Sequence, residues 1–433
     1  MLSLLRRLTP ARIFKFYHYL IAITGALYFR YPTKKMITIG VTGTSGKSTT
    51  IFLLGRILNA AGHKVGSSST IEFCIGDVCE LNKTKMTQRG RWGTQRFLAR
   101  MLQEKCDIAI VETTSQGIEQ FRHRGIFYDV CLLTNLYPEH IEAHGSFENY
   151  KNAKKKLFVY LAQLPKKIGV TKTAIVNGAI DQAQEFLEPP TERRWAIKAA
   201  TDHVAHAFVP EQIEIRGDGV SFTLEQVDFF VPLLGEHVVD NSVAAATAAF
   251  AVGVPFQKSA DVLKTVTTVP GRTEFIDQGQ PFKVMVDFAF EPVAMTKLYD
   301  VVKKIPHARI IHVLGGTGGG RDKARRPILG KIAAENAAIV IVTNEDPYDE
   351  PPREIIDMVA SGARAAGKNE ANGLVIIDDR RAAINFALQQ AQENDIIMIT
   401  GKGCEQAIVG PHFRLEPWDD RAVVREGLGH IKK

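Results

Sequence analysis

The sequence predicts an α/β protein built from two consecutive α/β units. First, an apolar segment, MITIGV, leads directly into the small-residue stretch TGTSGKSTT and then into IFLLGRILNAAG, which has the apolar spacing of a helix. Second, apolar runs of strand length continue to alternate with helical segments as far as residue 178. Third, five further runs of this kind follow Pro270-Gly271. Such alternation is typical of a mostly parallel sheet with helices on both faces.

The elements of the first unit follow from period and composition. Short apolar runs bounded by turn residues predict buried strands, and a lysine-rich stretch with helical spacing predicts a helix. Alternating apolar and polar residues in IEIRGDGVSFTL and VDFFVPL predict antiparallel strands, and the alanine-rich VDNSVAAATAAFAVGV predicts a compact helix. The predicted elements are strands at 106–113, 130–136 and 173–178, a helix at 147–164, antiparallel strands within 204–232 and a helix at 239–254.

The second unit repeats the alternation. Its predicted strands are FKVMVDFA, ARIIHVLGG, AAIVIVTNED, GLVIID and DIIMITG, and helical segments separate them. We therefore expect three parts along the chain: a short N-terminal helical segment (1–36), a central P-loop α/β domain (37–270) and a C-terminal Rossmann-like α/β domain (271–433).

The bulk composition is that of an ordinary globular protein. The 433 residues include 45% hydrophobic and 23% charged residues, and the formal net charge is +7. This mild basic excess suits an anionic substrate such as a nucleotide, or simply a solvated surface. No block of lysine and arginine with interleaved aromatics occurs, so we expect no nucleic-acid partner. The cysteines are widely spaced without a CxxC pair, so we expect free thiols and neither a zinc site nor a disulfide framework. They are Cys74, Cys79, Cys106, Cys131 and Cys404.

The N-terminal segment joins basic residues to an uncharged apolar run. Arginines and a lysine occupy several of the first fifteen positions, and the uncharged run 16–29 follows. This run is shorter than the roughly 20 residues that a membrane-spanning helix needs. No small-residue cleavage site precedes Arg30, which disfavours a signal peptide. Three alternatives remain: a helix at the membrane interface, a helix packed on the protein itself, and a true span. We expect a cytoplasmic protein, which contacts the inner face of the membrane through residues 1–31 if the first alternative holds.

The stretch TGTSGKSTT has the composition of a phosphate-binding loop. Between a strand and a helix, glycines let backbone N–H groups approach phosphate oxygens. Lys47 can neutralise the terminal phosphates of ATP, and the Ser48 hydroxyl can ligate Mg²⁺. The strict motif has glycine where this chain has Val41, and the alternative is a glycine-rich turn without a ligand. The residues expected to hold ATP here are Gly43, Thr44, Ser45, Gly46, Lys47, Ser48 and Thr49.

Polar residues also follow the neighbouring predicted strands. Glu112 ends the run AIVET, at the sheet edge where open α/β sheets bind ligands. Its carboxylate can hold Mg²⁺, or it is a strand-end acid that faces water. Asn135 and His140 follow the next strand, and the helix after them carries three consecutive lysines, 154–156. A solvated helix face is the simplest interpretation of such a run, and we adopt it for the second and third lysine.

Ordered motifs along the chain resemble those of the Mur ligases. GVTGTSGKSTT resembles the GTxGK(S/T)T loop of that family, and TNLYPEHIEAHGSFENYKNAKKKLF resembles its TNxxxDH…HG…Y…AK…LF segment. GEHVVDNSVAAATAA is similar to GxxNxxNxxAA, and VPGRTEFI with VMVDFAFEP is similar to GRxE…VDYAHxP. GGTGGGRDKARRPILG resembles GxGGxRDxxKRPxMG, TGKGCEQ resembles GKGHE, and PWDDR resembles FxDRE. The matches run in order from about residue 37 to 422 and are closest to the branch that adds the third amino acid to UDP-N-acetylmuramoyl-dipeptide.

The resemblance implies a reaction in peptidoglycan precursor synthesis. Mur ligases use ATP and Mg²⁺ to convert a substrate carboxylate into an acyl phosphate, which the amine of an amino acid then attacks. Such chemistry depends on charge neutralisation and alignment. The implied catalytic residues are Lys47, at the γ-phosphate, His140, and Lys154, which is carbamylated in the family. The implied ligands of two Mg²⁺ ions are Ser48, Glu112 and His140. Further implied contacts are Asn135, Asn241, Arg272 and Asp287 for ATP, Thr87, Thr114 and Arg122 for the donor, and Arg321, Asp346, Gly401 and Glu405 for the acceptor.

Several positions depart from the family pattern. Gln116 stands where the family has histidine, Phe290 replaces a histidine on the ATP side, and Cys404 replaces the histidine of GKGHE. The DNPR motif associated with meso-diaminopimelate becomes EDPY at 345–348, so its arginine is missing, and two acids follow at 349–350. An acidic pocket suits a cationic side chain better than a carboxylate, so we expect a lysine- or ornithine-like acceptor rather than diaminopimelate.

The sequence defines the type of reaction better than it defines the molecule that supplies the carboxylate. Three-domain Mur ligases carry a UDP-binding domain before the ATP loop, where this chain has only about 36 residues. We therefore expect a UDP-muramoyl-peptide or a related anionic donor, which includes a lipid-linked one. Two alternatives stay open: a folylpolyglutamate synthase-like or other two-domain peptide ligase with a non-UDP donor, and a non-catalytic ATP-binding scaffold. The second alternative does not explain why Lys47, Glu112, His140 and Lys154 are all present.

Overall fold

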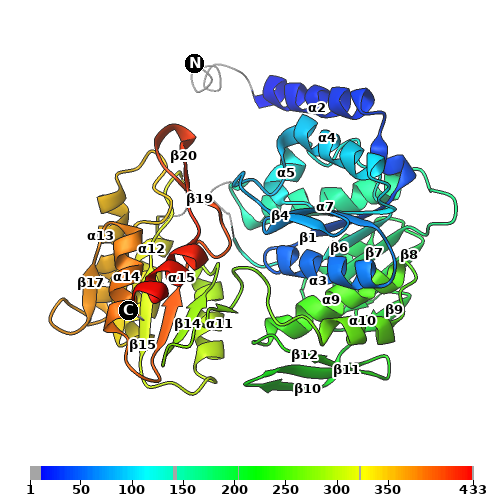
Figure 1. Cartoon of the computed structure of the whole chain (residues 1–433). Coiled ribbons are helices and arrows are strands. Elements are labelled where there is room, and N and C mark those ends of the chain that lie inside the picture. Colours follow the sequence, from blue (N-terminus) through cyan, green and yellow to red (C-terminus); the bar gives the residue numbers. More distant parts are fainter. Residues whose placement is uncertain (1–10, 140–143, 203, 321–322, 432–433) are drawn as a thin grey trace. The chain divides into compact units, whose positions relative to one another are not determined.

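The structure, a computed structural model, describes residues 11–139, 144–202, 204–320 and 323–431 (Figure 1). The chain divides into two compact units. Unit 1 runs to residue 214 and includes 220–231 and 236–266, and unit 2 comprises 215–219, 232–235 and the chain from residue 267 onward. The α/β class predicted from the sequence is confirmed in both units.

Unit 1 begins with α2 (Ala11–Tyr28), which lies against α4 (Gly90–Gln103) (Figure 1). Small residues of α2 make this contact: Ala26 is fully buried, and a Cβ built at Gly25 would lie 3.1 Å from the ring of Trp92. A short 3-10 helix, η1 (Pro32–Lys35), connects α2 to the first strand. Within the described ranges, no helix combines the length and the apolarity that a bilayer crossing requires.

A nine-stranded sheet forms the centre of unit 1. Its order is β4-β3-β2-β5-β1-β6-β7-β8-β9, and the pairs β2–β3 and β3–β4 are antiparallel while the others are parallel. The central strand, β1 (Ile37–Thr42), is an almost continuously buried apolar run, as a parallel strand covered on both faces must be. The other strands are β2 (Val65–Ser68), β3 (Glu72–Ile75), β4 (Val78–Leu81), β5 (Ile108–Glu112), β6 (Val130–Leu133), β7 (Thr173–Asn177), β8 (Arg193–Ile197) and β9 (His206–Phe208).

Helices and a small sheet complete unit 1. The helix after β1, α3 (Lys47–Ala60), packs on α9 (His237–Ala251), whose alanines permit a close approach. The lysine-rich helix, α7 (Phe147–Gln163), begins where the Ser146 side chain accepts a hydrogen bond from the Asn149 N–H, and it packs on α5 (Ser115–Glu119). The remaining elements are α8 (Ala183–Leu187), α10 (Phe256–Leu263) and the antiparallel strands β10 (Glu211–Arg216), β11 (Gly219–Leu224) and β12 (Val227–Val231), of which residues 215–219 are grouped with unit 2.

Unit 2 is built on a six-stranded sheet of order β13-β14-β18-β15-β16-β17. All pairs are parallel except β13–β14. Val284 and Val286 pack into a core on one face of the sheet, and Met285 packs into a second core on the other. The strands are β13 (Glu274–Phe275), β14 (Lys283–Val286), β15 (Ile310–Leu314), β16 (Ile339–Val342), β17 (Leu374–Ile376) and β18 (Ile396–Ile399), with β19 (Ala407–Val409) and β20 (Leu415–Pro417) in a separate pair. The helices are α11 (Pro292–Val302), α12 (Arg325–Asn336), α13 (Pro352–Ala365), α14 (Arg380–Gln390), α15 (Asp420–Ile431) and the 3-10 helix η2 (Pro411–Phe413).

Candidate active site

The predicted phosphate loop lies between the carboxyl end of β1 and the first turn of α3, and two of its glycines are required by their surroundings. Gly46 has a φ of 77°, in the left-handed region that favours glycine, and a Cβ there would lie 2.3 Å from Asn241 Oδ1. A Cβ at Gly43 would lie 1.9 Å from Thr134 Oγ1, at the end of the neighbouring strand β6. The loop is therefore pressed against two other segments of unit 1, which fixes its backbone.

Two lysines from different helices converge on one carbonyl of this loop. Lys47 Nζ donates to the carbonyl oxygens of Gly43, at 3.0 Å, and Thr44, at 2.9 Å. Lys154 Nζ reaches the same Gly43 oxygen at 2.7 Å from helix α7. The structure thus brings together the two lysines to which the family resemblance assigns catalysis, although they are over a hundred residues apart.

Lys154 is the buried member of this pair. Its side chain is almost inaccessible to water, and its Nζ lies 4.4 Å from the centroid of the Tyr150 ring. Burial, and secondarily the positive charge of Lys47, lower the pKa of Lys154 well below the ordinary value for lysine. The Tyr150 hydroxyl in turn donates to Thr44 Oγ1 at 3.0 Å, so helix α7 braces the phosphate loop at two points. A lowered pKa makes the Lys154 amine available in its neutral, nucleophilic form.

Ser48 and Glu112 meet at the same sheet edge, as the sequence predicts. Ser48 Oγ donates to Glu112 Oε2 at 2.9 Å, and the Glu112 side chain is buried. The Thr70 N–H also donates to Oε2, at 2.7 Å, and Thr70 Oγ1 lies 3.0 Å from Thr87 Oγ1. A serine hydroxyl beside a carboxylate supplies the hard oxygen ligands that Mg²⁺ prefers, so these residues fit the ion.

Asn135 braces the loop from the β6 side. Its Oδ1 accepts hydrogen bonds from the backbone N–H groups of Thr44, at 3.1 Å, and Ser45, at 2.8 Å, and its Nδ2 donates to the Ser45 carbonyl. The prediction that Asn135 lies at the ATP loop is therefore consistent with its position. Asn241 reaches the same loop from α9, where its Oδ1 accepts a hydrogen bond from Thr50 Oγ1 at 3.4 Å.

The predicted donor residues lie along the next segment of unit 1. Thr114 caps α5 by accepting the Gly117 N–H at 3.1 Å. Arg122 donates to the Gln88 carbonyl at 3.1 Å and to Gln120 Oε1 at 2.8 Å, and burial lowers its pKa. Thr87 and Arg122 are therefore joined through residue 88, which immediately follows Thr87. Thr114 joins them through Gly117, whose carbonyl accepts the Arg122 N–H at 2.8 Å.

Two predicted residues, His140 and Arg321, lie outside the described residues. Of the residues next to His140 in the sequence motif, His144 is described: its Nε2 lies 3.1 Å from Ser115 Oγ, and burial lowers its pKa.

The predicted ATP contacts of unit 2 lie together at the end of β14. Asp287 accepts the Thr273 N–H at 2.6 Å and the Ala289 N–H at 2.6 Å. The guanidinium of Arg272 lies 4.2 Å from the centroid of the Phe288 ring. The antiparallel pairing of β13 with β14 explains this proximity, because it places residues 272–273 beside residue 287.

The expected acidic pocket for the acceptor requires correction. Asp346 accepts a hydrogen bond from the buried Lys402 Nζ at 2.8 Å, and Glu405 lies 3.0 Å from the same ammonium. Glu350 pairs with Arg326 at 2.9 Å. These carboxylates are neutralised by cations of the chain itself, which a linear sequence does not reveal. Among the acids considered, Asp349 remains largely exposed.

Gly401 faces a further acid. A Cβ at Gly401 would lie 2.4 Å from Glu345 Oε2, and the Glu345 side chain is buried, with its Oε1 accepting a hydrogen bond from Thr317 Oγ1 at 2.6 Å. Burial and the neighbouring Asp346 raise the pKa of Glu345.

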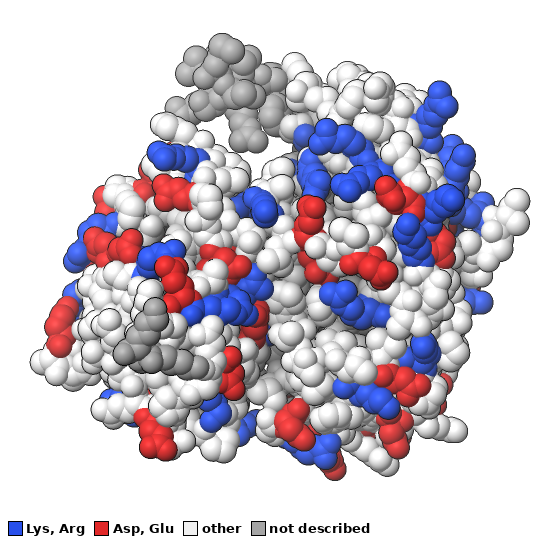
Figure 2. Space-filling view, viewed as in Figure 1, with Lys and Arg blue, Asp and Glu red and all other residues white. Residues whose placement is uncertain are grey.

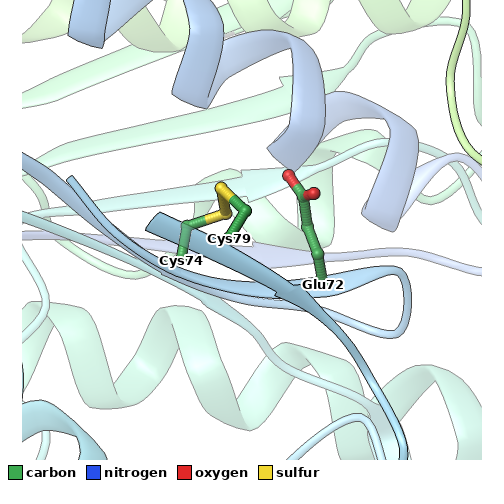
Figure 3. Close-up of side chains that lie close together, drawn as sticks. All are labelled: Glu72, Cys74 and Cys79. Carbon is green, nitrogen blue, oxygen red and sulfur yellow. A yellow bond between two sulfur atoms is a disulfide. The ribbon is translucent and has the colours of Figure 1, made fainter. Parts of the chain in front are cut away.

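The expectation of free thiols is wrong for one pair of cysteines. Cys74 and Cys79 form a disulfide across the hairpin of β3 and β4, beside Glu72 (Figure 3). The antiparallel register places the two residues directly opposite each other, and that register cannot be read from spacing alone. The bonded sulfurs offer no thiolate, so Glu72 alone is left as a metal ligand here. Cys106, Cys131 and Cys404 are free, as predicted, and they are buried.

Sequence reasoning missed the residues that connect the predicted ones. Thr70 lies in a serine- and threonine-rich turn after β2, and nothing in its spacing distinguishes it from its neighbours. Tyr150 lies one helical turn before Lys154, so a helical wheel places the two on one face. The assembled group has a loop of backbone N–H donors, two lysines and a serine–carboxylate pair. This arrangement can bind a nucleoside triphosphate and neutralise charge that moves between its phosphates and a second substrate.

Comparison with known proteins agrees with this chemistry. Residues 41–249 match the family model described as Mur ligase middle domain, and residues 271–403 match that described as Mur ligase, glutamate ligase domain. A UDP-N-acetylmuramyl-tripeptide synthetase from Roseiflexus sp. (strain RS-1) is 34% identical over 421 residues, which cover 95% of this chain and 82% of that protein. A UDP-N-acetylmuramoyl-L-alanyl-D-glutamate–2,6-diaminopimelate ligase from Bacillus cereus is 32% identical over 415 residues, which cover 94% of this chain and 81% of that protein.

Solved structures show the same relationship. A UDP-N-acetylmuramoyl-L-alanyl-D-glutamate–2,6-diaminopimelate ligase has a TM-score of 0.61 at 26% identity, over 94% of this chain and 82% of that chain. A folylpolyglutamate synthase from Mycobacterium tuberculosis, complexed with ADP and AMPPCP, has a TM-score of 0.69 at 15% identity, over 89% of this chain and 93% of that chain, and shares the fold. The identity to curated relatives over nearly the whole length, together with both domain matches, shows that the chain belongs to the Mur ligase family.

Proposed function

We propose that this chain is an ATP-dependent ligase that joins an amino acid to the carboxylate of a UDP-N-acetylmuramoyl-dipeptide-type donor in peptidoglycan precursor synthesis. The observation that carries the proposal is the convergence of Lys47, Ser48, Glu112 and Lys154 at the carboxyl edge of the sheet. The names of the relatives that are more than 30% identical support the choice of donor.

The reaction has two steps. A donor carboxylate oxygen attacks the γ-phosphorus of ATP, the bond to the β-phosphate oxygen breaks, and ADP leaves. The amine of the acceptor then attacks the carbonyl carbon of the acyl phosphate, inorganic phosphate leaves, and the amine loses a proton. In this scheme the loop N–H groups and Lys47 bind and neutralise the phosphates, and Thr87, Thr114 and Arg122 orient the donor.

Ser48 and Glu112 would hold Mg²⁺, which neutralises phosphate charge when it is bound. We assign His140 to a second Mg²⁺, as the family resemblance implies. In unit 2 we assign Arg272 and Asp287, with Asn241 of unit 1, to the nucleoside of ATP, and Arg321, Asp346, Gly401 and Glu405 to the acceptor.

We propose that Lys154 is carbamylated. A carbamate forms when a neutral amine attacks CO₂, and the low pKa of Lys154 supplies that neutral amine. The product is an anion within reach of the Lys47 ammonium, so the modification adds an attraction between opposite charges that the neutral amine does not provide. Turnover that falls in CO₂-depleted buffer and returns with bicarbonate supports the modification, and turnover indifferent to bicarbonate refutes it.

The acceptor is proposed to be lysine or ornithine rather than diaminopimelate. The side chain at position 348 supports this choice, since Tyr348 offers no guanidinium to the distal carboxylate of diaminopimelate. The acid at position 350 does not support it, because Glu350 pairs with Arg326. The reaction is proposed to take place in the cytoplasm, with residues 1–31 as the segment that would contact the inner face of the membrane.

The experiment measures phosphate release from ATP and Mg²⁺ with UDP-N-acetylmuramoyl-L-Ala-D-Glu and, separately, lysine, ornithine and diaminopimelate. Turnover that requires both the donor and one amino acid supports the ligase and names the acceptor. Lys154→Met is expected to lose turnover and keep ATP binding. Its matched control is Lys155→Met, because Lys155 lies on the same helix and pairs with Glu188 instead of the loop. ATP binding without turnover in any combination refutes the proposal.

A further inference from the structure

Helix α2 differs from an ordinary surface helix in which of its apolar side chains are exposed. A helix that packs on a soluble domain turns its large apolar side chains inward. Among the side chains of α2 that the structure describes, the buried ones are the small residues Ala22, Gly25 and Ala26, and most of the large apolar ones are exposed. Phe16 is 61% exposed and Tyr28 is 69% exposed. The exposed large residues among the described side chains of the helix are Ile13, Phe16, Tyr17, Tyr19, Leu20, Leu27 and Tyr28.

The exposed residues form a continuous stripe. Positions 13, 16, 17, 20, 27 and 28 recur at the helical spacing of three and four residues, so they share one face over the described length of α2. Trp92 of α4 extends this face, because its ring is exposed and lies 5.2 Å from the ring of Tyr28. We name these residues the α2 apolar face. A contiguous apolar surface of this kind marks an interaction site.

The segments that form the α2 apolar face and follow it in the sequence contain basic residues and no acids. The chain contains no aspartate or glutamate before Glu72, and none between residues 81 and 103, which include helix α4. Exposed basic residues follow the C-terminal end of α2, at Arg30, Lys34 and Lys35.

Helix α4 adds to the same charge pattern. Arg96 and Arg100 are exposed and follow Trp92 at four-residue intervals, so all three lie on one stripe of that helix. In Figure 2 the surface that corresponds to α2 in Figure 1 is white, and Lys and Arg atoms border it.

We propose that the α2 apolar face docks on an anionic phospholipid surface, with α2 lying in the plane of the interface. This deepens the membrane contact proposed above by naming the face and the lipid class, and it rests on that proposal. Aromatic side chains with polar tips suit the headgroup boundary, where Tyr and Trp concentrate. The basic residues are attracted to anionic headgroups, and a neutral bilayer offers no such attraction. The charge pattern favours this occupant over a second copy of the chain, whose own α2 region would bring the same positive charge.

The experiment is co-sedimentation of the full chain with phosphatidylcholine vesicles, and with vesicles that contain phosphatidylglycerol and phosphatidylcholine in equal parts. Because each basic residue near an anionic surface contributes roughly fivefold, partitioning onto the anionic vesicles is expected to be at least about tenfold stronger. The variant Arg30→Gln/Lys34→Gln/Lys35→Gln is expected to lose most of this preference at low salt.

A second variant tests the apolar contribution. Phe16→Ser/Leu20→Ser/Leu27→Ser is expected to lower partitioning more than about tenfold. Its matched control is Ile168→Ser/Ile213→Ser/Val293→Ser, which removes three exposed apolar side chains elsewhere and is expected to partition like the unchanged chain. Because all six side chains are exposed, thermal unfolding of both variants should stay close to that of the unchanged chain.

Two results would overturn the proposal. One is equal partitioning onto neutral and anionic vesicles by all variants. The other is a dimer in sedimentation velocity without lipid that the Phe16, Leu20 and Leu27 changes abolish, since it would assign the face to a second copy. The vesicle assay contains neither ATP nor donor, so its failure leaves the ligase proposal intact. Absent turnover with normal vesicle binding would refute only the ligase.

Discussion

Lys154 leads to a prediction about stability that is independent of turnover. The perturbation is Lys154→Met, which keeps an unbranched side chain in helix α7 and removes its amine. Burial lowers the pKa of this amine in the folded state, whereas the unfolded chain keeps a value of about 10.4. Between these two values the unfolded chain binds one more proton than the folded chain.

The sign and size of the effect follow from that proton. Stability rises with pH wherever the unfolded state binds more protons, so the contribution of Lys154 is fully present above about pH 10.4 and is lost as the pH falls. One proton corresponds to a slope of about 1.4 kcal/mol per pH unit. Between about pH 9 and about pH 10.4 the free energy of unfolding of the unchanged chain should therefore rise relative to that of Lys154→Met by about 1 kcal/mol per pH unit, because the slope declines as the unfolded lysine itself titrates.

The assay is urea unfolding in CO₂-depleted buffers across this alkaline range. Lys155→Met is the control and should keep the slope of the unchanged chain, because Lys154 is still present. Parallel pH dependences for the unchanged chain and Lys154→Met would show that the amine titrates as in the unfolded chain, and the reasoning from burial would fail. In bicarbonate the same variant is expected to lose at least about 100-fold in turnover, as loss of a charge-aligning group does.

Three further predictions concern other buried features. Asp420→Asn leaves Arg380 buried without its paired charge, since the two side chains are joined by hydrogen bonds of 2.8 and 2.7 Å. The free energy of unfolding in urea should fall by about 3–5 kcal/mol, and a loss under about 1 kcal/mol would contradict this. Gly46→Ala should weaken ATP binding measured by calorimetry, because alanine is strained at a φ of 77°, and unchanged affinity would mean that the loop tolerates another backbone. Cys74→Ser/Cys79→Ser should lower the free energy of unfolding by about 2 kcal/mol in non-reducing buffer, with no difference in reducing buffer, and a difference that survives reduction would show a packing effect instead.

The fold was predictable because the apolar pattern of this chain is strong. Strands such as β1 and β5 are short apolar runs buried on both faces, and that pattern identifies them without knowledge of their partners. The contact between Ser48 and Glu112 was predictable for the same reason, since adjacent parallel strands end at one edge of a sheet. The family resemblance added Lys154, which local pattern alone does not distinguish from the two lysines that follow it.

What could not be predicted depends on register and on long-range pairing. The Cys74–Cys79 disulfide requires the exact opposition of two residues across a hairpin. The neutralisation of Asp346 depends on Lys402, more than fifty residues away, so the motif EDPY looks acidic in sequence and is not so in the fold. The exposure of the large apolar residues of α2 could not be predicted either, because the sequence of an apolar helix does not show which side chains face the protein.

Because Lys47 donates a hydrogen bond to the Gly43 carbonyl, nucleotide binding at this loop replaces one contact of Lys47 with another. Lys47 and Lys154 each donate a hydrogen bond to this oxygen, so a phosphate that binds Lys47 competes with the carbonyl for that lysine. A triphosphate that draws Lys47 away gains a lysine–phosphate contact and gives up a lysine–carbonyl contact, and only the difference between them contributes to affinity. A nucleotide that does not reach Lys47 leaves the hydrogen bond between Lys47 and the Gly43 carbonyl in place. The selectivity of such a loop for ATP over ADP is therefore smaller than the number of new contacts suggests.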